Sequence, residues 1–529
     1  MVIAPTRSTD DRHRDNVALR RDNATLRLQL AEANARIAEL TAEVGRLATL
    51  VAQGNERIGE LLAIAQRKKR KPKKDKPDKP PEPPASVDEQ TRKAFEDRPA
   101  PPKLPDKEKP APKPRRPTGR QAVPEHLEAE RHTETPEHCA CCGSDDLKIV
   151  DEVVETKLHV VKEHQRRRVV ARKTGQCGNC GARTTARSLP APFPRSKATC
   201  EWLAWLVHQK FVMLAPLDRI RRDLASRGIT LSMSYLVTQI ERAADLLGPI
   251  DGEHWKQLLA GSWMATDATG LKVLIPKLPG CHNGHLEVYR RDNLVVFQYE
   301  PDKGAEALTS KLSSFAGVLV ADAEHRHNPL FENGRIIEAG CNAHGRRKLR
   351  DAESVQPVLA AEAGAFIAAV FVAEAEAQKR GLTGSALRAW RKEKVPPIQA
   401  DFWRWMDAVE PTLVPSDPLA AAIRYYRNHW KALFRFVDHP DIPLDNSASE
   451  REYQQVAKVR LNSLFAGSTE GAHRAATLLG IVATCRSLAV DPLAYLAWAF
   501  TRLGTHRDVY RLSASDLTPA AYARAAQAD

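Results

Sequence analysis

Fourteen prolines between residues 67 and 120 constrain this chain more than any other feature of its sequence. Because proline has a fixed φ and no backbone N–H, we expect this tract to form neither helix nor sheet. It carries 19 basic and 9 acidic residues but few apolar ones, which is typical of a semi-extended, disordered linker. The tract is either a solubilising spacer or a nonspecific contact to phosphates, and it divides the chain into parts that must fold separately.

The charge of the whole chain favours a polyanionic partner. Its 80 basic and 66 acidic residues leave a formal net charge of +14, most of it in the tract. With 529 residues, 42% hydrophobic and 28% charged, the chain is neither wholly disordered nor a membrane protein. The longest apolar run, residues 365–373, is shorter than the roughly 20 residues that cross a bilayer, and the polar N-terminus has no signal sequence. We therefore expect a cytoplasmic protein.

A heptad pattern precedes the tract, over residues 16–65. Its a positions hold Asn16 and Asn23 followed by Leu, Ile or Val, and its d positions are mostly Leu. Valine and isoleucine at a with leucine at d favour a parallel two-stranded coiled coil, and asparagine at a fixes the register. We predict a coiled coil over residues 10–66 that makes the protein a homodimer. The alternative is an amphipathic helix packed on its own domain.

Two Cys-x-x-Cys pairs follow the tract, within residues 121–198. The pairs are Cys139 with Cys142 and Cys177 with Cys180. A glycine after each pair permits the tight turn that points two sulfurs at one ion, and four thiolates suit a closed, tetrahedral Zn²⁺ site. We therefore predict one structural zinc ion in this segment. Cys141 competes as a ligand, and unligated reduced thiols are the alternative.

Residues 199–255 are predicted to form helices. A short turn at Gly228 separates two of them, and Ser232 or Ser234 is a candidate N-cap for the second. This pattern matches a helix-turn-helix that binds DNA, although any pair of antiparallel helices has the same pattern. The arginines around the turn either contact DNA or form a solvated face: Arg219, Arg221, Arg222 and Arg227.

Strand-like runs replace the helical periodicity in residues 256–345. We expect strands at residues 262–267, 286–290, 294–299, 317–321 and 336–339, with a helix at 303–315 before the fourth strand. Asp267 and Asp322 stand at the ends of the first and fourth strands, where a sheet would hold two carboxylates rigidly. Residues 346–440 and the following segment, residues 441–529, are predicted to be mostly helical.

Carboxylates at strand ends are suited to phosphoryl transfer on DNA. That reaction needs Mg²⁺ ions held by hard oxygen ligands, one ion for the attacking oxygen and one for the leaving oxygen. A third acid is expected from a later helix packed on the sheet, and Asp445, Glu450 and Glu452 are the candidates. Helical spacing does not distinguish Glu450 from Glu452. The alternative is that each acid only caps a turn or faces solvent, but their combination in a basic chain favours a nuclease or transferase.

Four late sequence blocks resemble those of DDE transposases of the insertion-sequence-66 family, in their large subunit. The blocks are Gly340-Cys-Asn-Ala-His-Gly-Arg-Arg-Lys348, Leu444-Asp-Asn-Ser-Ala-Ser-Glu-Arg451, Leu464-Phe-Ala-Gly-Ser468 and Asp491-Pro-Leu-Ala-Tyr-Leu496. The resemblance covers almost the whole chain. It implies a multidomain α/β protein with an N-terminal coiled coil, a zinc-binding segment, a helix-turn-helix and an RNase H-like catalytic domain with a helical insertion. It also implies that Glu450 is the third acid.

The resemblance further implies a function and a set of site residues. Such a protein binds transposon ends, cleaves DNA and joins the freed 3′-OH to target DNA, with two Mg²⁺ ions or with Mn²⁺ in their place. Asp267, Asp322 and Glu450 would be both the catalytic residues and the Mg²⁺ ligands. The residues implied to position DNA phosphates are His344, Arg346, Arg347, Lys348, Asn446 and Arg451. Double-stranded DNA and helper proteins from the same element would be the partners, at the bacterial nucleoid.

Two segments depart from the pattern of this family. The first acid is followed by Ala268 and Thr269, where the family usually has glutamate and threonine, and the residues after Asp322 are Ala-Glu-His-Arg-His. Neither departure removes a metal ligand. Two functions without catalysis stay open as alternatives: a DNA-binding regulator with a silent catalytic domain, and an assembly factor that only bridges DNA ends.

Overall fold

The computed structural model describes residues 87–105, 165, 174–176, 183–185, 190–505 and 512–528. All of them belong to the second of two compact units, Met1–Pro80 and Pro81–Asp529. The predicted coiled coil and the four cysteines of the predicted zinc site lie outside the described residues. Two short antiparallel strands, β1 (Thr174–Gln176) and β2 (Arg183–Thr185), flank the part of the sequence that contains Cys177 and Cys180.

A mixed five-stranded sheet forms the centre of the larger described region, with its strands in the order β5-β4-β3-β6-β7. The strands are β3 (Trp263–Leu274), β4 (Cys281–Arg291), β5 (Leu294–Glu300), β6 (Gly317–Ala321) and β7 (Ile336–Gly340). β3, β4 and β5 pair antiparallel, whereas β6 runs parallel to β3 and β7 runs parallel to β6. Helix α6 (Ala305–Lys311) connects β5 to β6, so the predicted order of three strands, a helix and two strands is confirmed.

The first strand of this sheet is longer than predicted. The sequence pattern predicts an end at Asp267, but β3 continues to Leu274 because Leu271 and Val273 keep the alternation of buried residues. Near the end of β3, Ala466 pairs with the strand through two backbone hydrogen bonds of 2.8 and 2.9 Å. Asp267 therefore lies inside a strand and not at its end.

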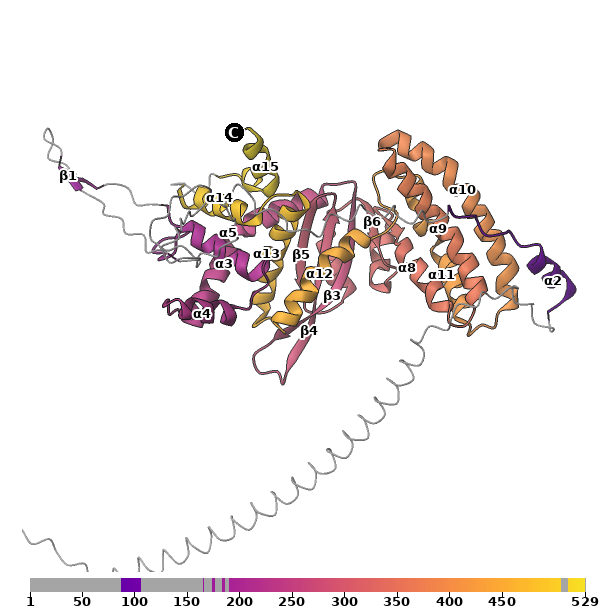
Figure 1. Cartoon of the computed structure of the whole chain (residues 1–529), viewed down its shortest axis with the longest axis horizontal. Coiled ribbons are helices and arrows are strands. Elements are labelled where there is room, and N and C mark those ends of the chain that lie inside the picture. The colour runs from indigo at the N-terminus through magenta and orange to yellow at the C-terminus, as the bar shows by residue number, and fades with distance from the viewer. Residues whose placement is uncertain are drawn as a thin grey trace, which may run out of the picture. The chain divides into compact units, whose positions relative to one another are not determined.

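One face of the sheet carries two separate hydrophobic cores, and the first covers β4, β5 and the end of β3. Its helices are α3 (Cys200–Phe211), α4 (Leu217–Ser226), α5 (Met233–Leu259), α12 (Ser447–Asn462), α13 (Thr469–Ser487) and α14 (Pro492–Thr505), with α15 (Pro519–Ala528) following in the chain. Figure 1 shows α12 lying across β3 and β4, and both strands contact this helix. The C-terminal helices thus complete the domain that the sheet begins.

The second core covers β6, β7 and the start of β3. Its helices are α8 (Asn342–Ala352), α9 (Pro357–Lys379), α10 (Gly384–Val409) and α11 (Pro418–Leu433), so the helices predicted over residues 346–440 are present. Of the described helices, α9 is the one whose length and apolar composition would suffice to cross a membrane. Its residues Phe366, Ile367 and Val370 are buried in this core, as expected for a helix inside a protein.

A third, smaller core lies on the opposite face of the sheet. It joins Met264 and Leu319 of the sheet to Leu258 of α5 and Leu308 of α6. The short helix α7 (Asn328–Phe331) connects β6 to β7, and 3-10 helices occur at His325–His327, Glu410–Thr412, Arg435–Val437 and Ala514–Leu517. Both faces of the sheet are therefore covered.

A helix interrupts the proline-rich tract. Helix α2 (Glu89–Glu96) begins at Asp88, whose side chain caps it, and Phe95 on this helix is 3% exposed and packs in the second core. The prediction that residues 67–120 form no helix is wrong at this point. No proline lies between residues 84 and 99, and Phe95 gains an apolar surface to pack on.

The two helices predicted around Gly228 are α4 and α5. Gly228 has a φ of 81°, a conformation that glycine adopts without strain. Of the two candidate N-caps for α5, Ser232 fills the role, because its hydroxyl accepts a hydrogen bond from the Tyr235 N–H at 3.2 Å. The pair of helices is thus in place, and its contact with DNA stays a prediction.

Candidate active site

Asp267 lies where the two cores on one face of the sheet meet. On that face of β3, Trp263 and Ala265 come before Asp267 and belong to the second core. Leu271 and Val273 come after it and belong to the first core. Neither core covers the carboxylate fully, so Asp267 is half-buried between them. One of its oxygens accepts a hydrogen bond from the Ala268 N–H at 2.8 Å. The break between two apolar cores therefore leaves room for a charged group on the sheet.

Asp322 directly follows the last residue of β6. This strand pairs parallel with β3, with Ala265 beside Val320, and the same register carried two residues further puts Asp322 beside Asp267. Directly paired residues of neighbouring strands point to the same face. The two aspartates predicted from the strand pattern thus come together on the face that carries the two cores.

Glu450 enters this region from the first turn of α12. The helix begins at Asn446, whose side-chain amide donates a hydrogen bond to the Thr266 carbonyl at 2.7 Å and whose backbone N–H contacts the Cys341 sulfur at 3.2 Å. Thr266 precedes Asp267 in β3. These two contacts therefore fix the start of α12, and with it Glu450, next to the first acid.

The structure distinguishes Glu450 from Glu452 as the candidate third acid, whereas helical spacing does not. The Glu452 carboxylate lies 2.8 Å from Arg290 and 3.9 Å from Arg486, so it is already neutralised by arginines of β4 and α13. Asp445 accepts a hydrogen bond from the N–H of Ser447 at 3.0 Å, at the start of the helix. Of the three candidates, Glu450 is the one whose charge acts on Asp267.

The three acids affect one another electrostatically. Burial raises the pKa of Asp267, and the nearby charges of Asp322 and Glu450 raise it further, whereas the Ala268 N–H and His344 lower it. The resulting pKa is about 6, compared with 3.8 for an ordinary aspartate. Carboxylates that oppose each other's ionisation in this way are typical of functional sites, and a bound cation removes their repulsion.

The donor atoms fit a hard divalent cation. Oxygen Oε1 of Glu450 is buried and has no hydrogen-bond partner among the described residues, and a metal ion would satisfy it. Cys341 and His344 lie close enough to Glu450 to form a softer ligand set. However, burial raises the pKa of the Cys341 thiol to about 11, so this thiol stays protonated and is a poor ligand. The carboxylates are therefore the groups suited to hold a hard divalent cation.

Basic side chains next to the acids come from α8. His344 Nε2 lies 3.6 Å from one oxygen of Glu450, and Arg347 lies 3.9 Å from the other. Arg346 and Lys348 point to the helical insertion instead, over the rings of Phe371 and Tyr425 at 5.6 and 4.9 Å. Of the four basic residues of α8 that are predicted to position phosphates, His344 and Arg347 thus lie at the acids.

The two remaining predicted phosphate contacts lie apart from this group. Arg451 lines an open polar pocket of about 450 Å³ together with Arg290, Glu452 and Arg486. Asn446 is 1% exposed, and its amide is bonded to the Thr266 carbonyl at the start of α12. Its implied role in positioning DNA phosphates stays a prediction.

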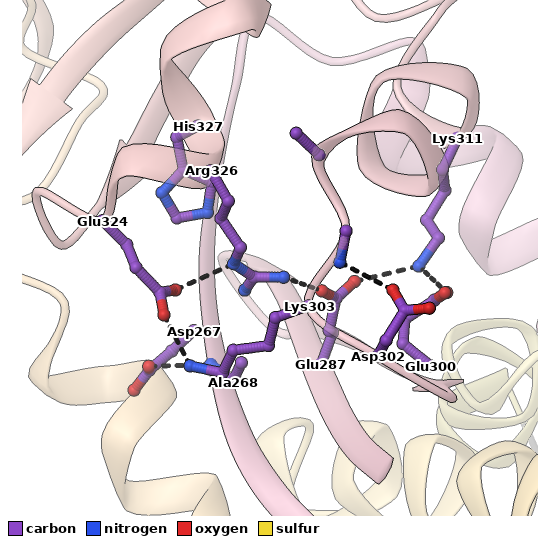
Figure 2. A network of polar contacts seen from close by, with 12 residues as sticks. Asp267, Ala268, Glu287, Glu300, Asp302, Lys303, Lys311, Glu324, Arg326 and His327 are labelled. Atoms are coloured by element: carbon purple, nitrogen blue, oxygen red, sulfur yellow. Dashed lines mark hydrogen bonds and ion pairs between the residues drawn. The ribbon is translucent and has the colours of Figure 1, made fainter.

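A buried charge network beside Asp322 was not predicted from the sequence (Figure 2). Its centre is Glu287 on β4, which is 1% exposed and contacts Arg326, Lys311 and the hydroxyl of Tyr289. Burial alone would raise the pKa of Glu287, but these three partners lower it to about 2. From the sequence alone, a glutamate in a strand is expected to face solvent. The one feature of the sequence that indicates burial of Glu287 is the apolar residues on either side of it (Leu-Glu-Val-Tyr).

The arginines around the predicted helix-turn-helix are mostly paired within their own helix. Arg221 and Arg222 contact Asp218 at 2.8 and 3.0 Å, and Arg227 contacts Asp223 at 3.0 Å. This pairing reduces the positive charge that α4 offers to DNA. It favours the prediction of a solvated face over that of a strongly basic contact surface.

The sheet and the acids define the class of protein as an α/β domain with a group of carboxylates at its central strands. A family model described as "Transposase IS66 family" matches residues 195–474, which is more than half of the chain. The protein belongs to the IS66 transposase family, which confirms the resemblance; the first three of the four late sequence blocks lie within the matched residues, and the fourth, residues 491–496, lies beyond them.

Three relatives from Sinorhizobium fredii (strain NBRC 101917 / NGR234) are similar over most of their length. The uncharacterized protein y4hP is 28% identical over 73% of this chain and 74% of its own. The uncharacterized protein y4qI is 27% identical over 75% of this chain and 76% of its own. The uncharacterized protein y4jD is 26% identical over 72% of this chain and 78% of its own. Family membership suggests a transposase that binds DNA and uses a divalent metal ion.

Proposed function

We propose that this protein is a DDE-type transposase that binds transposon ends and catalyses DNA strand cleavage and strand transfer. The observation that carries the proposal is the meeting of Asp267, Asp322 and Glu450, in which the last two raise the pKa of the first. Separate stretches of chain supply the three acids. Glu452 is paired with Arg290 at 2.8 Å, whereas the basic groups nearest Glu450, those of His344 and Arg347, lie 3.6 and 3.9 Å from its carboxylate.

The order of the strands supports an RNase H-like assignment for the catalytic domain. Three antiparallel strands are followed by two that run parallel to the first, and the first strand is central. The helical insertion lies between the second and third acids, over α8 to α11. This arrangement agrees with what the resemblance implies for the family.

In the proposed reaction, each group has a role that follows from its position. Asp267, on the central strand, would hold the divalent metal ions together with Asp322 and Glu450. When bound, the two divalent ions activate the attacking oxygen and stabilise the leaving oxygen. His344 and Arg347, which lie at Glu450, would hold the phosphate that is cut.

The test is Mg²⁺-dependent cleavage of DNA that carries the ends of the element, with the full chain. Glu450→Gln should lower the rate by orders of magnitude and leave DNA affinity within about twofold, because phosphate contacts elsewhere dominate affinity. Glu452→Gln is the matched control, since it lies two residues away on the same helix and should retain most of the activity.

The reverse result, with Glu452 essential and Glu450 dispensable, would show that the third acid is wrongly assigned. DNA binding without cleavage under any metal condition would favour a silent regulator. End pairing that persists in Asp267→Asn, with no cleavage by the unaltered chain, would favour an assembly factor.

We also propose a zinc ion at Cys139, Cys142, Cys177 and Cys180 and a homodimer through the coiled coil at residues 10–66. Support for the zinc ion comes from the Cys-x-x-Cys spacing and from the strands β1 and β2 that flank the second pair. Support for the dimer comes from the heptad pattern. A dimer would allow one assembly to hold two transposon ends.

A further inference from the structure

One arginine connects the loop that carries Asp322 to the strand β4. Arg326, four residues after Asp322, is 9% exposed. Its guanidinium donates to Glu287 on β4 and, through Nε, to Glu324 at 2.8 Å. Figure 2 shows this side chain extending from the loop toward Glu287. The arginine thus links the loop after β6 to a strand that is not its neighbour.

The strand register shows what this link spans. β3 lies between β4 and β6, and Glu287 pairs with Ala268, the residue after Asp267. Side chains of paired residues share a face, and successive residues alternate. Glu287 therefore lies on the face opposite Asp267, so the link runs behind the strand that carries the first acid. Ala268, on the same face as Glu287, is small enough to leave space there.

The charges of the network balance one another. Lys311 donates to Glu287 at 2.9 Å and also contacts Glu300, while Lys303 contacts Glu324 at 2.5 Å. Three carboxylates thus meet three cations, which a buried ion network requires to be stable. Arg326 pairs with Glu287 and Glu324 within the network, so its positive charge does not neutralise Asp322. The carboxylate of Asp322 remains available to a metal ion.

We propose that Glu287 and Arg326 are positioning residues that hold Asp322 in place for metal binding. The inference rests on the proposed function, because it takes Asp322 as a metal ligand. Neither residue touches the metal or the DNA. Residues that orient metal ligands in this way typically change metal affinity or activity by about 10–100-fold when they are replaced.

The test compares Glu287→Gln with Glu300→Gln in the full chain. Glu300 belongs to the same network, but among the described residues its carboxylate pairs with Lys311 alone, so it controls for the loss of one buried charge. For Glu287→Gln, the affinity for Mn²⁺ measured by titration without DNA should fall by about 10-fold or more. Hydrogen exchange of residues 322–331 should become faster, and DNA affinity should change little. Glu300→Gln should match the unaltered protein in all three measurements.

A second variant keeps the test decisive if Glu287→Gln fails to fold. Arg326→Lys preserves the buried charge but cannot contact Glu287 and Glu324 together, so it should weaken Mn²⁺ binding in the same direction. Unchanged Mn²⁺ affinity and exchange in the folded variants would overturn the inference.

Asp267→Asn separates a failure of this inference from a failure of the proposed function. If Asp267→Asn abolishes Mn²⁺ binding while Glu287→Gln and Arg326→Lys do not alter it, the positioning role alone is wrong. If Asp267→Asn also leaves Mn²⁺ binding unchanged, the metal site itself is wrong, and the proposed function fails with it.

Discussion

Asp251 on α5 illustrates how burial alone can hold one carboxyl group in its neutral form. One of its oxygens accepts a hydrogen bond from the Thr477 hydroxyl at 3.3 Å, and the other is buried without a hydrogen-bond partner among the described residues. Burial raises the pKa of Asp251 to about 7, and the Thr477 hydroxyl lowers it only in part. Unlike Asp267, this residue has no acidic neighbour that contributes to the shift.

Asp251→Asn should therefore stabilise the protein at neutral and higher pH. The unfolded chain ionises Asp251 near pH 3.8, whereas the folded protein resists ionisation up to about pH 7. The free energy of unfolding of the unaltered protein should fall relative to that of the variant as pH rises from about 4 to about 7. The gain at pH 8 should be about 1–3 kcal/mol, the cost of an unsatisfied buried group.

Urea unfolding at pH 5 and pH 8 measures this effect. Asp218→Asn is the control, because Asp218 is paired with Arg221 and Arg222 and its pKa is lowered; this variant should show no gain at pH 8. An Asp251→Asn protein that is less stable than the unaltered protein at pH 8 would contradict the assignment of Asp251 as a strained carboxylate.

Individual site residues were predictable to different degrees. Asp267 and Asp322 could be predicted because each ends or interrupts an apolar strand run. Glu450 required the resemblance to a family, since only the tertiary contacts of Glu452 with Arg290 distinguish the two glutamates. Glu287 and Arg326 could not be predicted, because their pairing joins segments whose proximity depends on the order of the strands.

Among the elements of the fold, α12 is held at its start by the side-chain amide of Asn446. Asn446→Ala would leave the Thr266 carbonyl and the start of the helix without their mutual hydrogen bond. We expect a loss of about 1–3 kcal/mol in the free energy of unfolding and a cleavage rate that falls at least tenfold, since Glu450 would move.

The control for this prediction lies at the other end of the same helix. Asn462 also donates its amide to a backbone carbonyl, that of Leu214, at 2.9 Å, but it is exposed and distant in sequence from Glu450. Asn462→Ala should leave the cleavage rate near that of the unaltered protein. Equal loss of activity in the two variants would show that α12 is not positioned by Asn446.

Helix α2 is an element that a composition argument overlooks. Phe95 packs in the second core. Arg98 forms a bidentate ion pair with Glu362 at 2.9 Å, and Glu362 also accepts a hydrogen bond from Trp405. Averaged over residues 67–120, the proline content hides a proline-free stretch long enough for two turns of helix. A single aromatic residue within a polar tract was the available signal.

Phe95→Ala should release α2 from the helical insertion without unfolding the sheet. Removal of a buried phenylalanine costs about 3–5 kcal/mol, which exceeds what a helix of eight residues gains by itself. Limited proteolysis should then cleave within residues 87–105 much faster than in the unaltered protein. Lys93→Ala, on the exposed side of the same helix, should leave the cleavage rate unchanged, and equal rates in both variants would contradict the docking of Phe95.

At the scale of the whole molecule, the zinc proposal gives a stoichiometry. Metal analysis of the full chain should find about one zinc ion per chain, and Cys177→Ser should lose it, because a structural zinc site needs all four thiolates. Cys281→Ser is the control, since Cys281 is a free cysteine on β4. Full zinc occupancy in Cys177→Ser would exclude this ligand set and direct attention to Cys141.

The basic tract gives a prediction about salt. Deletion of residues 67–86 removes nine basic and three acidic residues but keeps α2. DNA binding should then depend less steeply on salt concentration, because fewer counterions are released, while the preference for transposon ends should persist. Binding measured at several salt concentrations tests both points. Loss of end preference would show that the tract reads sequence and is more than a spacer.

The division of one sheet face into two cores has a consequence for how the molecule melts. Asp322 follows a strand whose valines lie in the second core, whereas Glu450 lies on a helix that contributes Val456 to the first. A cation shared by these acids would cross-link the two cores. Without metal, thermal unfolding followed by calorimetry should proceed in separate steps, and with metal it should proceed as one cooperative transition. The metal-binding acids would then also be the groups that make the domain unfold as a unit.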